Sequence, residues 1–370
     1  MVVGVLTCSY PRFAGDAAGS FVADEVRRLT EQGCAVEVVA AGDGPAGVTR
    51  AREGAVTVTR IGGGLLPAGA LFYGDGAPEA LERRGARAWL EAAHFTAVLC
   101  REVRAAATRW DAVVSHWLVP CALSAIAAAP GLRHRGVAHS GDVALLERIP
   151  FGRALARWLA GSGADLTFVS EDLRRRFALL AGRCVGRVER LAPDTRLFHP
   201  VSADARRAAR ERLGFARPTV LSVGRLVPIK GFDLLIDAVA DGAPETDLAI
   251  LGAGPQEAAL RSHARQRGVR LRLPGFVPRH QVPAWLAAAD LYVQPSRVLP
   301  SGRTEGLPVA TLEALAVGLP VIASRSGGLV ELAANPGRVS FCAPNDLASL
   351  RAALIATGIG RAALVHRVQV

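Results

Sequence analysis

The sequence predicts an α/β fold with two Rossmann-like, doubly wound, parallel-sheet domains, and three observations support this prediction. The 370 residues suffice for two cores, because a domain usually has about 100–200 residues. Short apolar runs alternate with helical stretches in both halves, which is typical of strand–helix–strand units. Several of these runs end in glycine-containing loops, where open α/β sheets bind ligands. We therefore expect domains at residues 1–200 and 201–370, facing a ligand-binding cleft between them.

In the first half, a glycine-containing loop joins the first expected strand to the first expected helix. Val2–Thr7 is an apolar run typical of a buried strand, and Phe21–Gln32 has a helical pattern. Gly19 in the loop would let the backbone approach a phosphate closely, although an ordinary tight turn is the alternative. The loop lacks the GxGxxG pattern, which disfavours an NAD site. A long helix is expected at Ala80–Thr108, and further strands at Ala35–Ala40, Ala55–Ile61, Asp111–Ser115, Arg135–His139 and Leu166–Val169.

Two histidines stand at the ends of expected strands. His116 follows one strand, and His139 ends the next, directly before Ser140-Gly141-Asp142. Open α/β sheets carry their chemistry at the carboxyl ends of strands. A lone histidine is more often structural, but the adjacent glycine and aspartate favour a functional His139. Ser170, after the last strand of this half, is expected to cap the helix that follows.

The second half repeats the alternation after a proline-containing transition near Pro200. The strand Thr219–Val223 leads into a turn that carries Arg225 and Lys230, and Lys230 is the single lysine of the chain. These two cations would neutralise a diphosphate, because arginine supplies a two-pronged fork and lysine a compact charge. The alternative is a pair of solvated surface charges. Further strands are expected at Leu248–Leu251, Leu271–Leu273, Leu291–Gln294 and Val321–Ala323.

The stretch Gly302–Leu315 places two carboxylates beside the start of a helix. Pro308–Val317 has a helical pattern that begins with proline and ends before Gly318. Glu305 then lies in the entry loop and Glu313 inside the helix. Because a helix start offers free N–H groups and favours anions, this arrangement suits a sugar nucleotide. The alternative is an acidic residue that only stabilises the helix dipole.

Composition limits the classes of partner. The net charge of +11 indicates anionic partners, but no nucleic-acid-binding motif accompanies the arginines, so no nucleic acid is expected. The six cysteines are scattered without a CxxC pair, which argues against a metal cluster or a disulfide framework. No basic leader precedes the first strand, and no apolar run reaches about 18 residues. We therefore expect a cytoplasmic protein.

As a set, the motifs of the second half resemble the retaining GT-B glycosyltransferases of the family-4 type, the glycosyl transferases of group 1. The resemblance covers roughly Val220–Leu332 and rests on Gly224-Arg225-Leu226 with Lys230-Gly231, Gly252-Ala253-Gly254-Pro255, Glu305 and Glu313 with Gly306-Leu307-Pro308, and Gly327-Gly328 with Glu331. The first half resembles the family more loosely, through Gly19, His116-Trp117, His139-Ser140-Gly141-Asp142 and Ser170-Glu171.

The resemblance implies a hexosyltransferase that moves a sugar from a UDP- or GDP-linked donor to an acceptor hydroxyl, with retention of configuration. The acceptor would be a sugar, a lipid-linked sugar or a small molecule, and a lipid-linked acceptor allows peripheral contact with the inner membrane face. No Asp-x-Asp occurs, which fits a reaction that requires no metal. The implied catalytic residues are His139 and Glu305, and the implied donor-binding residues are Gly19, Arg225, Lys230, Val277, Glu305, Gly306, Leu307 and Glu313.

The chain departs from the family pattern in two places. Ala192–Phe198 lacks the usual Gly-Val pair, and the segment after Asp346 is shorter than the usual C-terminal helix, which implies altered domain coupling. One alternative is therefore a non-catalytic or weakly active nucleotide-sugar-binding protein. A glycosidase would use Glu305 and Glu313 as paired carboxylates, but plain glycosides need no diphosphate-binding cations. An anionic-membrane or nucleic-acid binder would use the arginine clusters instead.

Overall fold

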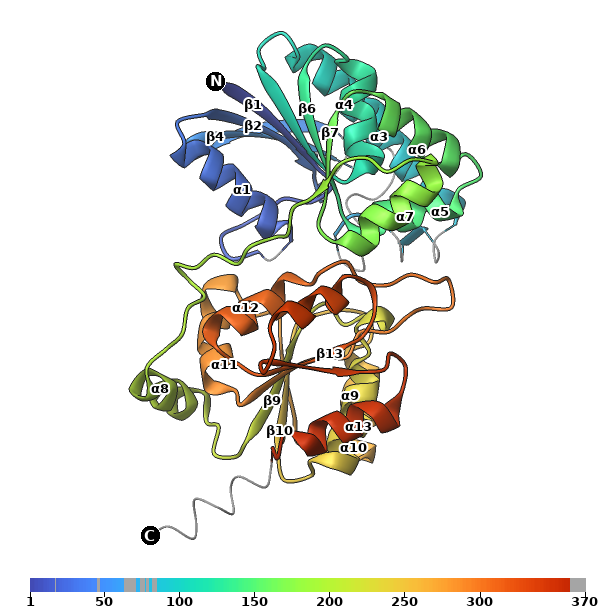
Figure 1. The fold of residues 1–370 in the computed structure, drawn as a ribbon. Helices are drawn as coiled ribbons and strands as arrows, with labels where there is room; N and C mark the ends of the chain where they lie inside the picture. The colour runs from blue at the N-terminus through green and yellow to red at the C-terminus, as the bar shows by residue number, and fades with distance from the viewer. Residues whose placement is uncertain are drawn as a thin grey trace. The chain divides into compact units, whose positions relative to one another are not determined.

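The computed structural model consists of two compact α/β units, Met1–Arg190 and Leu191–Val370 (Figure 1). It describes residues 1–16, 18–44, 47–62, 71–73, 77, 80–81 and 85–359. The units divide after Arg190 and not near Pro200, because Leu197 and Phe198 already pack in the core of the second unit. Both units are built on largely parallel sheets, which confirms the predicted fold class.

Among the described residues, the first unit contains an eight-stranded sheet in the order β3-β4-β2-β1-β5-β6-β7-β8. Neighbouring strands pair in parallel except β3 and β4, which form an antiparallel hairpin around Gly54, a residue with φ of 63°. The sequence did not predict β3, so this sheet departs from the expected parallel order at one edge. The strands are β1 (Val2–Thr7), β2 (Ala35–Ala41), β3 (Val48–Glu53), β4 (Val56–Ile61), β5 (Ala112–His116), β6 (Arg133–Ala138), β7 (Asp165–Phe168) and β8 (Arg187–Val188).

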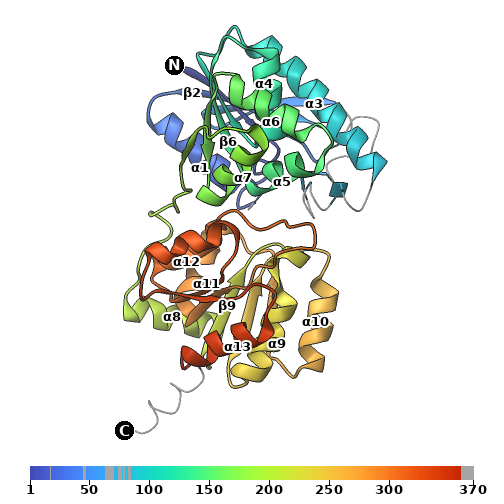
Figure 2. The ribbon, with the colours of Figure 1, turned by 45° about the vertical axis from the view of Figure 1, so that its right-hand side comes forward.

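Helices cover both faces of the first sheet (Figures 1 and 2). The predicted long helix begins at Ala86, after Gly85 with φ of 55°, and the predicted residues 82–84 lie outside the described part of the chain. Ser170 caps α7 as predicted, because its hydroxyl accepts a hydrogen bond from the Leu173 amide at 3.3 Å. The helices are α1 (Ser20–Glu31), α3 (Ala86–Ala106), α4 (Leu123–Ala128), α5 (Ser140–Arg148), α6 (Gly152–Gly161) and α7 (Glu171–Ala181), with a π-helical turn at Leu118–Ala122.

The described part of the second unit contains a six-stranded parallel sheet in the order β11-β10-β9-β12-β13-β14. This is the doubly wound order, in which the chain direction across the sheet reverses between the first and fourth strands, here β9 and β12. Ligands bind at such a reversal, beyond the carboxyl ends of the strands. The strands are β9 (Thr219–Val223), β10 (Asp247–Leu251), β11 (Leu271–Gly275), β12 (Leu291–Gln294), β13 (Val321–Ser324) and β14 (Val339–Cys342), of which β14 was not predicted.

Two hydrophobic cores lie on the two faces of the second sheet. Val220 packs in one core and its neighbour Leu221 in the other, because successive strand residues point to opposite faces. Glu331 lies in a 3-10 turn, Gly327–Ala334. No helix in the described part of the chain has the length and apolarity needed to cross a membrane. The helices of this unit are α8 (Ala203–Leu213), α9 (Phe232–Gly242), α10 (Glu257–Gln266), α11 (Val282–Ala288), α12 (Val309–Val317) and α13 (Leu347–Ala356).

Candidate active site

The loops after β9 and β12 meet at the reversal point of the second sheet. Lys230 Nζ lies 2.9 Å from Glu305 Oε2, and the two side chains are 12% and 13% exposed. Gly231 permits this approach, because its φ is 64° and a Cβ there would overlap the Pro295 carbonyl oxygen. The structure thus joins the two charged residues that the sequence singled out, although 75 positions separate them.

A chain of buried polar side chains holds Glu305 in place. Ser296 Oγ and Gln294 Nε2 both donate to Glu305 Oε2, at 3.0 and 3.3 Å. The Tyr292 hydroxyl donates in turn to Gln294 Oε1 at 2.9 Å. Among the described residues these donors and Lys230 all bind Oε2, which leaves Oε1 as the oxygen that can accept from a sugar hydroxyl.

Sequence reasoning missed Gln294 and Ser296, which are fully buried. A signal was present, because Tyr292, Gln294 and Ser296 place a polar atom at every second position at the end of an otherwise apolar strand. Their side chains therefore point to one face of the sheet, which is the face that Glu305 reaches.

Glycines fix the backbone around this pair. The Gly328 amide donates to the Glu305 carbonyl oxygen at 3.2 Å, while Gly327 has φ of 52° and leaves no room for a Cβ beside that oxygen. After β10, a Cβ at Gly252 would overlap the Gly224 carbonyl oxygen. The Leu226 amide donates to the Ala253 carbonyl oxygen at 2.9 Å. The turn after β10 thus packs closely against the turn that follows β9 and is hydrogen-bonded to it.

The remaining predicted donor-binding residues occupy different environments. Arg225 is exposed, and within the described residues its guanidinium makes no ion pair. Gly306 is buried, and Leu307 is part of the core against which Val277 packs. As predicted, Glu305 precedes α12 and Glu313 lies within it.

Glu313 is only 7% exposed and has a cationic neighbour. Arg279 Nη2 lies 3.4 Å from Glu313 Oε1, and its guanidinium carbon lies 5.6 Å from the centre of the Phe198 ring. Arg279 was missed by sequence reasoning, although it stands two positions after Val277. The Arg279 guanidinium thus orients the Glu313 carboxylate within α12.

In the first unit, aromatic and imidazole rings cluster at the equivalent reversal between β1 and β5. The Phe21 ring centre lies 4.9 Å from that of His139, 5.7 Å from that of His116 and 5.8 Å from that of Trp117. Gly19 caps α1 with φ of 66°, and a Cβ there would overlap the Ser9 carbonyl oxygen. Gly19 therefore lies directly before α1, and Phe21 in the first turn of that helix packs against the predicted His139.

His139 is buried and bonded to a second histidine. Its Nε2 lies 3.3 Å from His116 Nδ1, and His116 Nε2 lies 3.1 Å from Glu25 Oε2. Burial lowers the pKa of His116 to about 3, and burial followed by His116 lowers the pKa of His139. Both imidazoles are therefore neutral near pH 7. The His116 Nδ1–His139 Nε2 distance fits one hydrogen bond between the two neutral rings, in which one imidazole donates and the other accepts.

Asp142 ties the two loops of this cluster together. Its carboxylate accepts from the Leu118 amide at 2.6 Å and from the His139 amide at 3.0 Å. Burial raises the pKa of Asp142 to about 7, although these backbone N–H groups oppose the rise. The segment before Leu118 is strained, because Trp117 has φ of 70° without being glycine. Asp142 thus holds a strained turn beside His139.

Replacing His134 should flatten the acid dependence of stability. His134 Nε2 lies 2.9 Å from Ser115 Oγ, and burial lowers the pKa of His134 to about 4. Between its ordinary pKa of about 6.5 and about 4, the unfolded chain binds a proton that the folded chain does not, so stability falls as pH falls. Between pH 7 and pH 5, we expect the free energy of unfolding to fall by about 2 kcal/mol less in His134→Gln than in the wild type.

Urea unfolding of both proteins at several pH values measures this difference. Asp142 has the opposite sign, because its raised pKa makes the folded chain bind the extra proton, but it is present in both proteins and cancels. Equal pH slopes for the two proteins would contradict the prediction.

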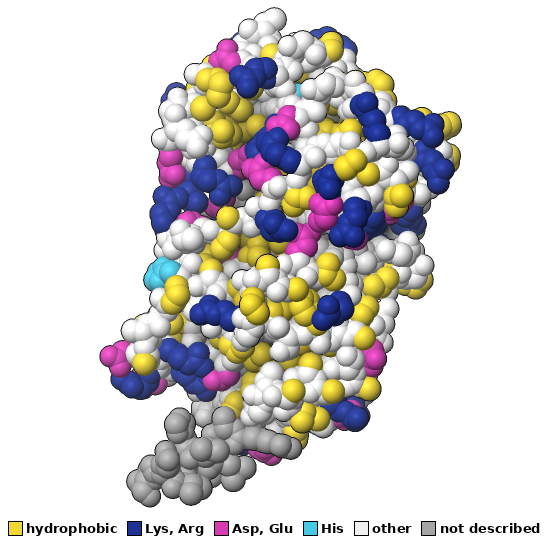
Figure 3. Space-filling view, viewed as in Figure 1, with side chains coloured by type: hydrophobic (Ala, Val, Ile, Leu, Met, Phe, Trp, Pro, Cys, Tyr) yellow, Lys and Arg dark blue, Asp and Glu magenta, His cyan; other side chains and the backbone are white. Residues whose placement is uncertain are grey.

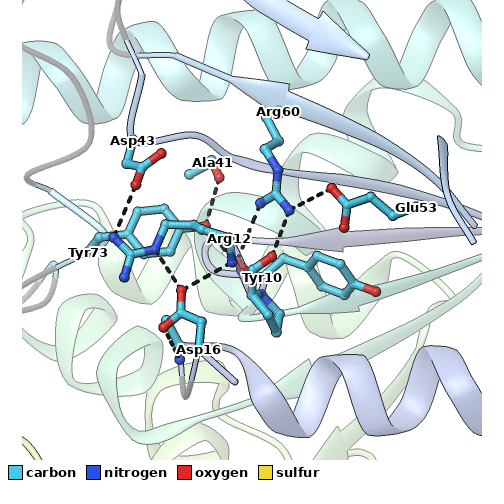
Figure 4. Close-up of polar contacts among 10 residues, drawn as sticks. Tyr10, Arg12, Asp16, Ala41, Asp43, Glu53, Arg60 and Tyr73 are labelled. Atoms are coloured by element: carbon cyan, nitrogen blue, oxygen red, sulfur yellow. Dashed lines mark hydrogen bonds and ion pairs between the residues drawn. The ribbon is translucent and has the colours of Figure 1, made fainter. Parts of the chain in front are cut away.

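The loop between β1 and α1 is held by the polar network of Figure 4. Arg12 Nε lies 2.7 Å from Asp16 Oδ2 and Arg12 Nη1 lies 3.1 Å from Asp43 Oδ2, while its guanidinium carbon lies 4.5 Å from the centre of the Tyr73 ring. Arg60 Nη2 donates to the Pro11 carbonyl oxygen at 2.7 Å (Figure 4). The loop that ends at Gly19 is therefore ordered by long-range contacts.

Tyr73→Phe should destabilise the first unit by about 1–3 kcal/mol, the cost of unsatisfied buried polar groups. The Tyr73 hydroxyl accepts from the Tyr10 amide at 3.2 Å and lies 2.8 Å from the Ala41 carbonyl oxygen (Figure 4). Phenylalanine keeps the ring under Arg12 and removes only the hydroxyl. Denaturant unfolding checks the value, and a loss below a few tenths of a kcal/mol would show that the hydroxyl bonds are replaceable.

Comparison with known proteins identifies the second unit. Residues 206–357 match the family model described as glycosyl transferases group 1. The chain is 40% identical over 192 residues to the GDP-mannose-dependent alpha-(1-6)-phosphatidylinositol monomannoside mannosyltransferase of Mycolicibacterium smegmatis. The matched segment covers 50% of this chain and 50% of the relative. The chain is 38% identical over 142 residues to the putative colanic acid biosynthesis glycosyltransferase WcaL of Salmonella typhimurium, covering 36% of this chain and 34% of the relative. The chain thus spans about half the length, or less, of the curated relatives it matches.

Solved structures agree on the fold. Sucrose-phosphate synthase from Thermosynechococcus elongatus has a TM-score of 0.73 at 19% identity and covers 95% of this chain and 88% of its own. HepE from Anabaena, solved with UDP-glucose, has a TM-score of 0.67 at 19% identity and covers 98% of this chain and 91% of its own. These likenesses show the GT-B fold. Residues 206–357 of the second unit thus resemble the group 1 glycosyl transferases.

Proposed function

We propose that this protein is a retaining hexosyltransferase that uses a nucleotide diphosphate sugar. The observation that carries the proposal is the Lys230–Glu305 pair, held at the reversal point of the second sheet by buried donors. The leaving group of such a transfer is a nucleoside diphosphate, whose developing charge needs fixed cations. Lys230 and the exposed Arg225 would supply them.

The other residues of the second unit would orient the donor. Glu313, which Arg279 contacts at 3.4 Å, would accept hydrogen bonds from the ribose hydroxyls. Glu305, through its Oε1, and the backbone of Gly306 and Leu307 would hold the donor sugar. Val277 would lie near the base. No step of this scheme requires a metal, which stays a prediction.

In this scheme the first unit, Met1–Arg190, binds the acceptor and the second unit, Leu191–Val370, binds the donor. Gly19 would let the backbone of its loop approach the phosphates. His139 would contact the sugar as a neutral hydrogen-bonding group, because burial lowers the pKa of His139 well below its ordinary value. A neutral imidazole adds no charge next to the carbon that becomes electron-poor in the transition state.

The names of relatives support a nucleotide diphosphate sugar as donor. One relative's name gives GDP-mannose as donor and a phosphatidylinositol mannoside as acceptor, and HepE was solved with UDP-glucose. We propose a GDP- or UDP-linked hexose as donor and a sugar or lipid-linked sugar as acceptor for this chain. A lipid-linked acceptor would place a cytoplasmic enzyme in peripheral contact with the inner membrane face.

Donor binding tests the proposal. Thermal unfolding with GDP, UDP, GDP-mannose and UDP-glucose should show stabilisation by one nucleotide class, because a ligand that binds only the folded state raises its stability. Glu313→Ala should weaken that binding by about 10–100-fold, the value of hydrogen bonds to a charged group. The matched control is Glu257→Ala, which removes an exposed carboxylate on α10 that pairs with Arg261 at 2.9 Å.

The outcomes separate the proposals. Stabilisation by one nucleotide class, lost in Glu313→Ala and kept in Glu257→Ala, supports the donor site. Stabilisation without sugar transfer to any acceptor supports the alternative of a non-catalytic nucleotide-sugar-binding protein. No stabilisation of folded protein by any of the four compounds overturns both.

A further inference from the structure

Helix α6 in the first unit has one face in the core and an opposite face in solvent. At about 100° per residue, the buried Gly152, Ala156 and Leu159 point to one side. Phe151, Arg153, Arg157 and Trp158 lie on the other side; this set is called the α6 face below. Phe151 is 75% exposed and Trp158 is 43% exposed. Large aromatic side chains gathered in solvent indicate an interaction surface.

The arginines of the α6 face have no polar partner in the described part of the chain. Among the described residues, neither Arg153 nor Arg157 forms an ion pair or a hydrogen bond. The carboxylates of the neighbouring segments are engaged elsewhere, since Glu147 pairs with Arg176 and Glu171 with Arg174. The charge on the α6 face is therefore uncompensated and positive.

Helix α7 packs beside α6 and carries further exposed apolar and cationic side chains. Leu179 is 81% exposed, and Arg175, four residues earlier on the same side of the helix, has a side chain that is 70% exposed. Arg183 donates to the Ala160 carbonyl oxygen at the end of α6. Figure 3 shows Lys or Arg side chains next to hydrophobic ones at the upper right, where Figure 1 places α5, α6 and α7.

We propose that the α6 face, extended by Leu179, docks onto an anionic lipid bilayer. Tryptophan and phenylalanine partition into the headgroup region of a bilayer, and arginines beside them pair with lipid phosphates. This combination of exposed aromatic and uncompensated cationic groups is complementary to an anionic bilayer. A nucleic-acid site would need a groove with stacking platforms, and an acidic protein partner would not require the exposed aromatics.

The position of the face suits a lipid-linked acceptor. Helix α5 starts directly after His139 and ends three residues before Phe151. Its nine residues span about 13 Å at about 1.5 Å per residue. Helix α5 and the short segment after it thus connect His139 to the α6 face. The inference rests on the lipid-acceptor part of the proposed function, but vesicle binding is measured separately from donor binding.

Co-sedimentation tests the proposal with vesicles of phosphatidylcholine alone and of phosphatidylcholine mixed with phosphatidylglycerol. We expect the full chain to bind the mixed vesicles, and to bind them less at high salt because ions screen exposed charges. Arg153→Gln with Arg157→Gln should weaken this binding by about 30-fold. Phe151→Ser with Trp158→Ser should weaken it by at least about tenfold, since the buried aromatic area is lost.

Matched controls remove the same groups elsewhere. Arg207→Gln with Arg212→Gln on α8 removes two exposed arginines and changes the net charge equally. Ile355→Ser on α13 removes an apolar side chain that is 42% exposed. Both controls should bind vesicles like the wild type. Nucleotide stabilisation should stay unchanged in every variant, so that failure of docking is distinct from failure of donor binding.

Fluorescence locates the inserted residue. Lipids brominated on the acyl chain should quench Trp158, and Trp158→Phe should abolish the quenching while vesicles still bind. Three outcomes overturn the proposal: no binding to anionic vesicles, equal weakening by the α8 control, or quenching that persists in Trp158→Phe and disappears in Trp89→Phe, where Trp89 is the 45% exposed tryptophan on α3.

Discussion

Lys230→Ala is expected to lower kcat of sugar transfer by about 10²–10³-fold, the cost of removing one group that stabilises transition-state charge. Two effects combine in this variant. The donor diphosphate loses a fixed cation, and Glu305 Oε2 loses its charged partner at 2.9 Å. Lys230→Arg should restore little of the activity, because the larger guanidinium has no room beside Gly224. A Cβ on Gly224 would already lie 2.9 Å from Lys230 Cε.

A double variant separates the two effects of the lysine. Lys230→Ala leaves the Glu305 carboxylate, 13% exposed, with only the neutral donors Ser296 and Gln294. Glu305→Gln in that background removes the uncompensated charge, so it should recover stability in urea unfolding without recovering activity. Recovery of both would show that the lysine acts only by neutralising Glu305.

The control for Lys230 is Arg265→Ala, which removes an exposed cation on α10. We expect this variant to transfer sugar at the wild-type rate. Lys230→Ala with activity within a few-fold of wild type, in protein that melts normally, would contradict a diphosphate-binding role. Steady-state kinetics with the nucleotide sugar that stabilises the protein provides the measurement.

Gly327→Ala is expected to destabilise the second unit strongly. The residue has φ of 52°, which costs a non-glycine residue about 1–2 kcal/mol. In addition, its Cβ would overlap the Glu305 carbonyl oxygen and lie 2.8 Å from Thr304 Oγ1. Relieving such overpacking costs about a further 1–3 kcal/mol and moves the loop that carries Glu305.

Gly318→Ala is the matched control for this prediction. Gly318 ends α12 with φ of 99°, but no atom within 4 Å would meet its Cβ. It should therefore lose stability from backbone strain alone and keep nucleotide binding. Gly327→Ala should lose more stability in urea unfolding and should also bind the nucleotide sugar more weakly. Equal losses in the two variants, with binding intact, would show that the Glu305 loop does not depend on Gly327.

Strand boundaries were predictable where strands are buried on both sides. Val2–Thr7, Thr219–Val223 and Leu291–Gln294 have the predicted bounds, because a buried parallel strand is a continuous apolar run. The edge strand Val48–Glu53 was missed, since it is exposed and contains arginines. Its sequence carries no apolar pattern, and only its pairing with Val56–Ile61 makes it a strand.

The candidate site was predictable in part. Lys230 and Glu305 were found because their motifs are local: a turn after a strand and a loop before a helix. Gln294 and Ser296 were missed, because the role of a buried polar residue in a strand depends on its hydrogen-bond partner, here Glu305, which the sequence does not reveal. Arg279 was missed for the same reason, since its partner Glu313 lies 34 positions away.

The sequence by itself determined the alternation of strands and helices, the glycine turns and the loops that carry the charged residues, because these depend on neighbouring residues along the chain. Only the tertiary structure decided which loops meet. The strand order β11-β10-β9-β12-β13-β14 places Lys230 against Glu305, and it results from hydrogen bonds between distant strands. The tertiary structure also decided that Phe151 and Trp158 stay in solvent, since the exposure of an apolar residue depends on what packs against it.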